Sequence, residues 1–172
     1  MNDTALRTNY IIRKATKDDI PILVRMRLML QVHMEMVNEQ ILKHNETWKM
    51  GLPRFYSDLI NNSNSLVLLV FDHEQGQAVG MIIGQLIEDR NMEDLWVVKI
   101  NDVWVEEDYR RKGLCSLMVN KLKEFYKEIG IKTFTLNYVI NNMEAESTWK
   151  ALGFEPIIKS CVMRGNFGEV NP

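Results

Sequence analysis

The segment Tyr109-Arg110-Arg111-Lys112-Gly113-Leu114-Cys115-Ser116 decides the fold prediction for this chain. The apolar run Val97 to Val105 precedes it and predicts a strand, and the apolar periodicity that begins at Leu114 predicts a helix. A basic turn with one glycine between a strand and a helix is typical of a polyanion site, because the first N–H groups of a helix have no intrahelical partner. Gly113 lets the backbone approach a ligand closely, and the three cations before it supply charge. We therefore expect the ligand to be a pyrophosphate.

The spacing of this turn excludes two common phosphate motifs, since the chain has neither G-x-G-x-x-G nor G-x-x-x-x-G-K-[ST]. Arg110-x-x-Gly113-x-Cys115 instead resembles the [RQ]-x-x-G-x-[GA] signature of the GNAT acyltransferases, which bind acetyl-CoA. Downstream, Asn142-x-x-Ala145-x-x-x-Trp149-x-x-x-Gly153-Phe154 is similar to the second signature of that family, N-x-x-A-x-x-x-Y-x-x-x-G-F. The resemblance covers Val97 to Phe154, and Ile11 to Pro21 also fits it.

Apolar runs and turn residues predict a mixed α/β fold of order β-α-α-β-β-β-α-β-α-β with an antiparallel front half. The strands are expected at 10–14, 66–71, 78–87, 95–105, 132–139 and 159–164, and the helices at 18–37, 53–60, 113–129 and 143–152, with 38–51 irregular. The resemblance implies a GNAT fold, with helices on both faces of a mixed sheet and a splayed pair of strands that admits the pantetheine arm. We expect residues 1–9 to be a frayed extension and residues 10–172 to be a single N-acetyltransferase domain.

Composition limits the class of protein. With 172 residues, 46% hydrophobic and 26% charged, the chain suits one soluble globular domain. A net charge of −2 argues against a nucleic-acid surface, and no apolar run is long enough to span a bilayer. Two cysteines provide no disulfide framework and no metal-ligand cluster, so no metal is expected and the expected location is the cytoplasm.

The resemblance implies a cofactor site for acetyl-CoA. The backbone of Val103 and Val105 would hold the pantetheine arm like an added strand. The amides of the turn would face the pyrophosphate, and the residues implicated there are Arg110, Arg111, Lys112, Gly113, Leu114, Cys115 and Ser116. Asn142 would contact the pantetheine side of the cofactor, although it would also serve as a helix N-cap. Trp149 would pack over the arm.

The catalytic positions depart from the family. The position nine residues before Arg110 often holds a glutamate that orders a catalytic water, and here it is Asn101. The helix position that commonly holds an acidic tyrosine is Trp149, whose indole has no usable acid proton. Asn101 would orient a water, and Tyr138 would offer a phenol near the sulfur unless it is a plain sheet aromatic. Asp102 is not expected to be the base, because strand alternation would turn it to the opposite side of the sheet.

Cys115, His33 and His44 each allow a structural interpretation as well as a chemical one. Cys115 replaces a small residue of the signature, so it either fits there as a small side chain or acts as an activated thiol that accepts the acyl group. His33 and His44 fall where the substrate-side helices of the family lie, but neither has a second ligand at a metal-binding spacing, which favours an ordinary surface or core role.

The leading functional prediction is an N-acetyltransferase that moves the acetyl group of acetyl-CoA to a primary amine by direct attack. The acceptor would be a small molecule or a peptide, and the family resemblance also allows a homodimer. Loss of both familiar catalytic side chains leaves a second hypothesis, a non-catalytic acyl-CoA-binding sensor. A third is a nucleotide-phosphate site unrelated to CoA.

Overall fold

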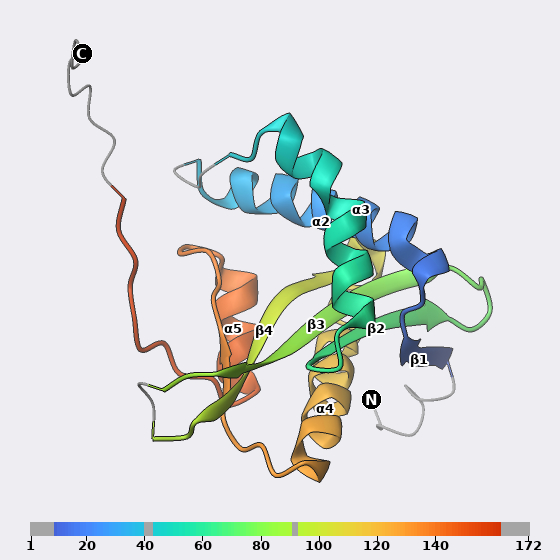
Figure 1. The fold of residues 1–172 in the computed structure, drawn as a ribbon. Coiled ribbons are helices and arrows are strands. Elements are labelled where there is room, and N and C mark those ends of the chain that lie inside the picture. Colours follow the sequence, from blue (N-terminus) through green and yellow to red (C-terminus); the bar gives the residue numbers. More distant parts are fainter. Residues whose placement is uncertain (1–8, 40–42, 91–92, 163–172) are drawn as a thin grey trace, which may run out of the picture.

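A computed structural model describes residues 9–39, 43–90 and 93–162. Its five-stranded sheet has the order β1-β2-β3-β4-β5, and Figure 1 labels the first four of these strands. Strands β1 (Tyr10–Lys14), β2 (Ser65–Asp72), β3 (Ala78–Glu88) and β4 (Trp96–Val105) pair antiparallel in succession, and β5 (Phe134–Leu136) pairs parallel with β4. The predicted mixed α/β class with an antiparallel front half is confirmed.

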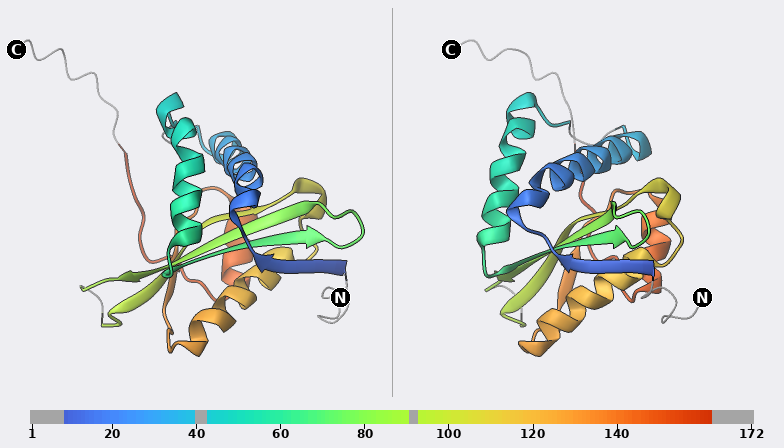
Figure 2. Two further views of the ribbon diagram at one scale, coloured as in Figure 1. Left: turned by 45° about the vertical axis from the view of Figure 1, so that its right-hand side comes forward. Right: turned by 90° about the vertical axis from the view of Figure 1, so that its right-hand side faces the viewer.

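Helices cover both faces of the sheet. On one face lie α2 (Ile20–Val37), which follows a 3-10 turn at Lys17–Asp19, and α3 (Glu46–Asn61). On the other lies α4 (Leu114–Glu128), preceded by a 3-10 turn at Glu107–Tyr109, as the two views of Figure 2 make clear. The short helix α5 (Met143–Ala151) adds its Trp149 to the α4-side core. Strand alternation divides the apolar side chains between the two cores, so that Leu68 and Ile82 face α4 while Leu69 and Ile83 face α2 and α3.

The contact between α4 and the sheet depends on a glycine of β3. The Tyr126 hydroxyl donates a hydrogen bond of 2.9 Å to the carbonyl oxygen of Gly84. A Cβ at position 84 would lie 2.6 Å from Leu122 Cδ1 and 3.0 Å from Tyr126 Cε2. Any larger residue would therefore push α4 away from the sheet.

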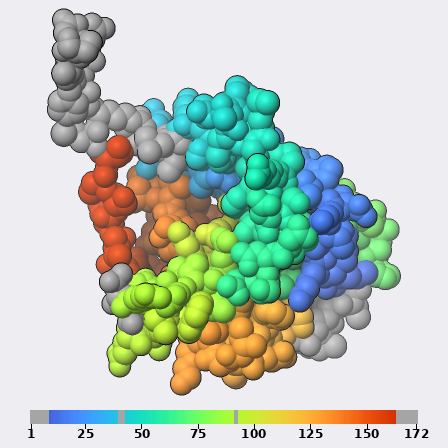
Figure 3. All heavy atoms as spheres, viewed as in Figure 1, coloured from blue at the N-terminus to red at the C-terminus, as the bar shows by residue number. Residues whose placement is uncertain are grey.

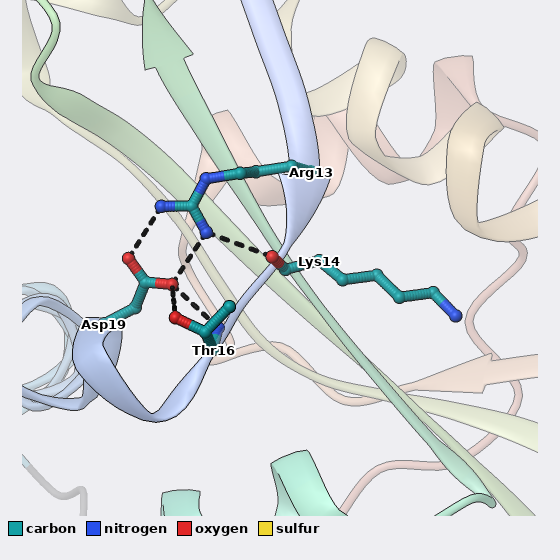
Figure 4. Close-up of polar contacts among 4 residues, drawn as sticks. All are labelled: Arg13, Lys14, Thr16 and Asp19. Carbon is teal, nitrogen blue, oxygen red and sulfur yellow. Dashed lines mark hydrogen bonds and ion pairs between the residues drawn. The ribbon is translucent and has the colours of Figure 1, made fainter.

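An ion pair fixes the junction of β1 and α2 (Figure 4). Arg13 donates to both carboxylate oxygens of Asp19, at 2.7 and 2.8 Å, and the N–H and hydroxyl of Thr16 donate to Asp19 Oδ2. The Arg13 hydrogen bond is the main cause that lowers the pKa of Asp19 to about 2. Asp19 therefore stabilises the turn that sets the direction of α2 across the sheet.

The second helix is longer than its sequence pattern predicts. The prediction placed 38–51 in an irregular segment and began the helix at Pro53, whereas α3 begins at Glu46. Asn45 caps it, since Asn45 Oδ1 accepts the Trp48 N–H at 2.9 Å. Pro53 lies inside the helix, where it removes one backbone donor. Burial of Leu52, Tyr56 and Leu59 offsets that loss. Helix propensities of the residues do not include this energy of packing against the rest of the fold.

The predicted last strand at 159–164 is wrong over the part of it that the structure describes. Residues 159–162 belong to no strand and are exposed, while 163 and 164 fall outside the described residues, as do 1–8 of the predicted frayed extension. Ile157 and Ile158 are also exposed, and the red segment in Figure 3 stands away from the body over most of its length. An apolar pattern alone does not form a strand when no neighbouring edge pairs with it.

Gly84→Ala should lower the free energy of unfolding by about 1–3 kcal/mol, because an added methyl group overpacks the contact with Leu122 and Tyr126. Urea denaturation monitored by circular dichroism measures this. The matched control is Gly51→Ala in α3, where a Cβ meets nothing within 4 Å. That change should instead stabilise the protein by about 0.5–1 kcal/mol, and equal effects of the two substitutions would contradict the packing argument.

Asp19→Asn should destabilise the protein by about 1–2 kcal/mol at neutral pH, allowing for the partial exposure of Arg13. Because the pKa of Asp19 is lowered in the folded state, its contribution is complete above the unfolded pKa and disappears as pH falls through about 2. Urea titrations of wild type and variant should therefore converge between about pH 4 and pH 2. Asp18→Asn, at the exposed neighbouring carboxyl, should change stability by less than about 0.5 kcal/mol. A constant wild-type advantage across this pH range would exclude the ion pair as its source.

Candidate active site

A cavity of about 970 Å³ opens where β4 and β5 part. Strand β5 pairs with β4 only through Val98, Lys99 and Ile100, and it ends at Leu136, so the predicted strand at 132–139 is three residues long. The next five residues of β4, 101–105, line the cavity. Most of the remaining wall comes from α2, the basic turn, the first turn of α4, the segment after β5, and α5, including Leu30, His33, Met34, Arg110, Arg111, Gly113, Leu114, Cys115, Ser116, Tyr138, Asn142 and Trp149.

The strands part at a β-bulge in β4. Gly84 pairs with Ile100 and Ile82 with Val103, so Ile83 of β3 faces two residues of β4, Asn101 and Asp102. A bulge leaves its extra residue outside the ladder and bends the strand. The bend carries the rest of β4 away from the line of β5, which explains why the parallel pairing stops at Ile100. The cavity is therefore a consequence of one inserted residue.

The bulge also overturns the expectation that Asp102 faces the opposite side of the sheet from Asn101. Asn101 Nδ2 donates to Gln85 Oε1, and Gln85 shares the face of Ile83, under α2 and α3. Asp102 accepts from the hydroxyl of Tyr56, on α3, at 3.0 Å. Both side chains thus lie on one face, because the extra residue breaks the alternation on which the prediction rested.

Asp102 is held in a buried polar cluster that no sequence motif signals. Arg27 Nε lies 3.2 Å from Asp102 Oδ1, and the two side chains are 12% and 17% exposed. The Arg27 guanidinium stacks 4.7 Å over the ring of Trp48 and donates to Gln31. Burial raises the pKa of the Asp102 carboxyl, although Arg27 and Tyr56 favour its charged form. The cluster joins residues from α2, α3 and β4, so only the folded chain brings them together.

The backbone of the basic turn presents amide donors to the cavity. Arg111 and Gly113 have positive φ values of 57° and 84°. The Leu117 N–H makes the first intrahelical bond, 3.0 Å to Gly113 O, so the N–H groups of Leu114, Cys115 and Ser116 precede the hydrogen-bond ladder of α4. Of the three cations, Arg110 and Arg111 line the cavity, whereas Lys112 is exposed with Nζ 4.7 Å from the ring centre of Tyr109.

The side chain of Arg110 folds inward, away from the start of α4. Its Nε donates to Val105 O at 3.2 Å, and its guanidinium carbon lies 4.9 Å over the ring of Trp104. His33 of α2 meets the same Trp104 ring edge to face, at 5.9 Å. Burial, and then the charge of Arg110, lower the pKa of His33. His44 lies elsewhere, stacked on Trp48.

The opposite wall contains the residues of the second motif. Asn142 caps α5, since its Oδ1 accepts the Ala145 N–H at 3.0 Å, which confirms the capping role; its cofactor contact stays a prediction. Trp149 is buried in the α4-side core and meets Phe154 edge to face. Tyr138 lies beyond the end of β5, not on the strand as expected, and is half-buried on the cavity wall.

Two classes of site do not occur in the part of the chain that the structure describes. It holds no group of three or more His, Cys, Asp or Glu side chains placed to bind a metal ion. None of its helices is both long and apolar enough to cross a membrane.

Comparison with known proteins agrees with this geometry. The acetyltransferase (GNAT) family model matches residues 33–154. An uncharacterized N-acetyltransferase of Methanocaldococcus jannaschii is 30% identical over 80 residues, which are 46% of this chain; the match spans only 35% of that relative's length.

Solved structures share the fold at lower identity. The BH1408 protein of Bacillus halodurans superposes with a TM-score of 0.77 at 19% identity, over 90% of this chain and 99% of that one. A predicted acetyltransferase of Clostridium acetobutylicum, solved with acetyl-CoA, gives 0.72 at 17% identity over 90% and 96%. An aminoglycoside 6'-N-acetyltransferase of Acinetobacter baumannii gives 0.68 at 17% over 92% and 99%. The family match, with this fold, shows that the chain belongs to the acetyltransferase (GNAT) family.

Proposed function

We propose that this protein transfers the acetyl group of acetyl-CoA to a primary amine by direct attack, in the cytoplasm, and that residues 10–172 form one N-acetyltransferase domain. One observation carries the proposal: a single cavity runs from the bulge in β4 to the amide-lined start of α4. Such a cavity suits a long ligand with a reactive thioester at one end and a pyrophosphate at the other.

The cofactor would lie along the edge of β4 that β5 leaves unpaired. Val103 and Val105 pair with Ile82 and Gly80 on one side, and their other side borders the cavity. Their backbone groups would bond to the pantetheine arm as an added strand does. Asn142 and Trp149 would border the arm from α5.

The amides of residues 111–116, at the start of α4, would bind the pyrophosphate. Arg111 and Lys112 would add charge to that end of the cavity, since Arg111 lines it and Lys112 is exposed on the same turn. Arg110 would contribute only its long-range charge there, because its side chain turns toward Trp104.

The reaction would proceed at the bulge. The neutral amine nitrogen attacks the thioester carbonyl, the carbon–sulfur bond breaks, CoA leaves as a thiolate, and the nitrogen gives up one proton to water. Backbone N–H groups freed from the ladder at Asn101 and Asp102 are suitable donors for the oxyanion. Positioning would supply much of the acceleration, since Asn101 is not a base and its amide already bonds to Gln85. The phenol of Tyr138 is the proposed proton donor to the departing sulfur.

Acetyl-CoA incubated with a panel of amines and short peptides should release thiol in an amine-dependent manner. Gly113→Glu should lower CoA affinity at least about 100-fold, because bulk and negative charge would stand against the pyrophosphate. Gly113→Asn is the matched control, since Asn tolerates a positive φ and stays neutral, and its loss should be much smaller. Calorimetry measures both affinities. Tight CoA binding with no thiol release would favour the non-catalytic sensor, and no CoA binding would refute the proposal.

Cys115 should not carry the acyl group. Burial raises the pKa of its thiol to about 12, so that only about one molecule in ten thousand is a thiolate at pH 8. Alkylation by iodoacetamide, followed by mass spectrometry, should therefore modify the exposed Cys161 at least about 100-fold faster than Cys115. Cys115→Ala should keep amine-dependent thiol release within about threefold of wild type, whereas trapping an acetylated Cys115 would contradict direct attack.

A further inference from the structure

Arg110 places a partly buried cation on the cavity wall beside Trp104. Its side chain is 20% exposed and rests on Trp104, which belongs to the core beneath α2 and α3. Asn101 and Asp102 of the bulge lie on that same face of the sheet. If transfer occurs at the bulge, an amine that enters from the α2 side passes this guanidinium.

The hydrogen-bonding capacity of Arg110 is largely unused. Arg13 makes a bidentate pair with Asp19 at 2.7 and 2.8 Å, the usual range for a charge-assisted bond. Arg110 bonds to Val105 O through Nε, and its terminal nitrogens make only a long ion pair with the half-exposed Glu144, at 3.6 Å, within the described part of the chain. A guanidinium fork has five N–H donors, so several remain for a ligand.

Beside Arg110 on this wall lies one buried donor that has no partner among the described residues, and the carboxylates near it are either already paired or exposed. Trp104 Nε1 is buried and finds no hydrogen-bond partner within the described residues. Asp102 is already neutralised by Arg27 and bonded by Tyr56. Glu107 and Glu144 lie at the exposed rim, where water screens their charge. A buried N–H group without an acceptor is costly, so a ligand oxygen that accepts its hydrogen bond would be favourable there.

We infer that the acceptor is an amine that also carries a carboxylate, and that Arg110 binds this carboxylate; the inference rests on the proposed acetyl transfer. A planar carboxylate matches the geometry of the N–H donors of a guanidinium group. The Trp104 N–H would supply a further hydrogen bond to the same ligand. Trp104 lies two residues beyond Asp102, about 6–7 Å along an extended strand. An amine at the bulge and a carboxylate at Arg110 are therefore a few bonds apart, as in γ-aminobutyrate.

The test compares kcat/KM for γ-aminobutyrate and for butylamine, in which a methyl group replaces the carboxylate. Wild type should prefer γ-aminobutyrate by about 10- to 100-fold, the worth of a hydrogen-bonded charge pair. Arg110→Gln should bring this ratio close to one by raising KM for the acid, and Arg110→Lys should restore part of it. Arg111→Gln is the matched control on the same turn: it should weaken acetyl-CoA affinity and leave the ratio unchanged.

A wild-type ratio at or below one, or a ratio that Arg110→Gln leaves unchanged, would overturn the inference. Preference for putrescine would indicate a cationic acceptor, and preference for aminopropyl phosphate would indicate phosphate; either result would also overturn it. If wild type acetylates none of these amines, the broad amine panel and CoA binding decide the proposed function separately. Calorimetry with the CoA-bound protein then decides the inference: Arg110-dependent binding of γ-aminobutyrate but not butylamine supports it, and any other result refutes it.

Discussion

The β-bulge at Asn101 and Asp102 is the constraint on which the rest of the site depends. A regular β4 would continue its parallel pairing beyond Ile100 and close the space beside β5. The extra residue instead bends the strand, ends β5 at Leu136, and leaves one edge of β4 beside the cavity. The same bulge puts two successive side chains on one face. The binding cavity and the arrangement of its polar wall therefore have one cause, a local change in backbone register.

Asp102 links the bulge to both helices above it, through its ion pair with Arg27 of α2 and its hydrogen bond from Tyr56 of α3. Taking two charges out of water is costly, so such a pair adds little net stability compared with apolar residues of similar size. Removing one partner, however, would leave a buried charge alone, and this makes the arrangement of the three elements specific. Tyr56 and Trp48 satisfy the pair from α3. Helices α2 and α3 are thus positioned relative to the bulge by polar contacts as well as by apolar packing.

Features that depend on neighbouring residues could be predicted from the sequence. The bounds of β1, the turn at Gly113 and the end of α4 before Gly130 follow from neighbouring residues and were predicted closely. Prediction failed where the outcome depends on distant partners: α3 extends through Pro53 because its apolar face is buried, and residues 159–162 form no strand because no edge receives them. The predicted face for Asp102 is wrong because the prediction assumes regular side-chain alternation along the strand, and that alternation does not reveal a bulge. The cavity wall contains every residue predicted for the site except Lys112, but their chemical roles stay predictions.

The three cations of the basic turn illustrate why a motif locates a backbone better than it locates long side chains. Arg110, Arg111 and Lys112 are consecutive, yet only the first two line the cavity, Arg110 folds onto Trp104, and Lys112 lies over Tyr109. The amides at the start of α4 can bind a pyrophosphate without all three charges, because helix N-termini attract anions through their N–H groups. Arg110 is therefore available for a different ligand group. This separation is what allows the two proposed binding ends, a backbone end for the cofactor and an arginine end for the amine.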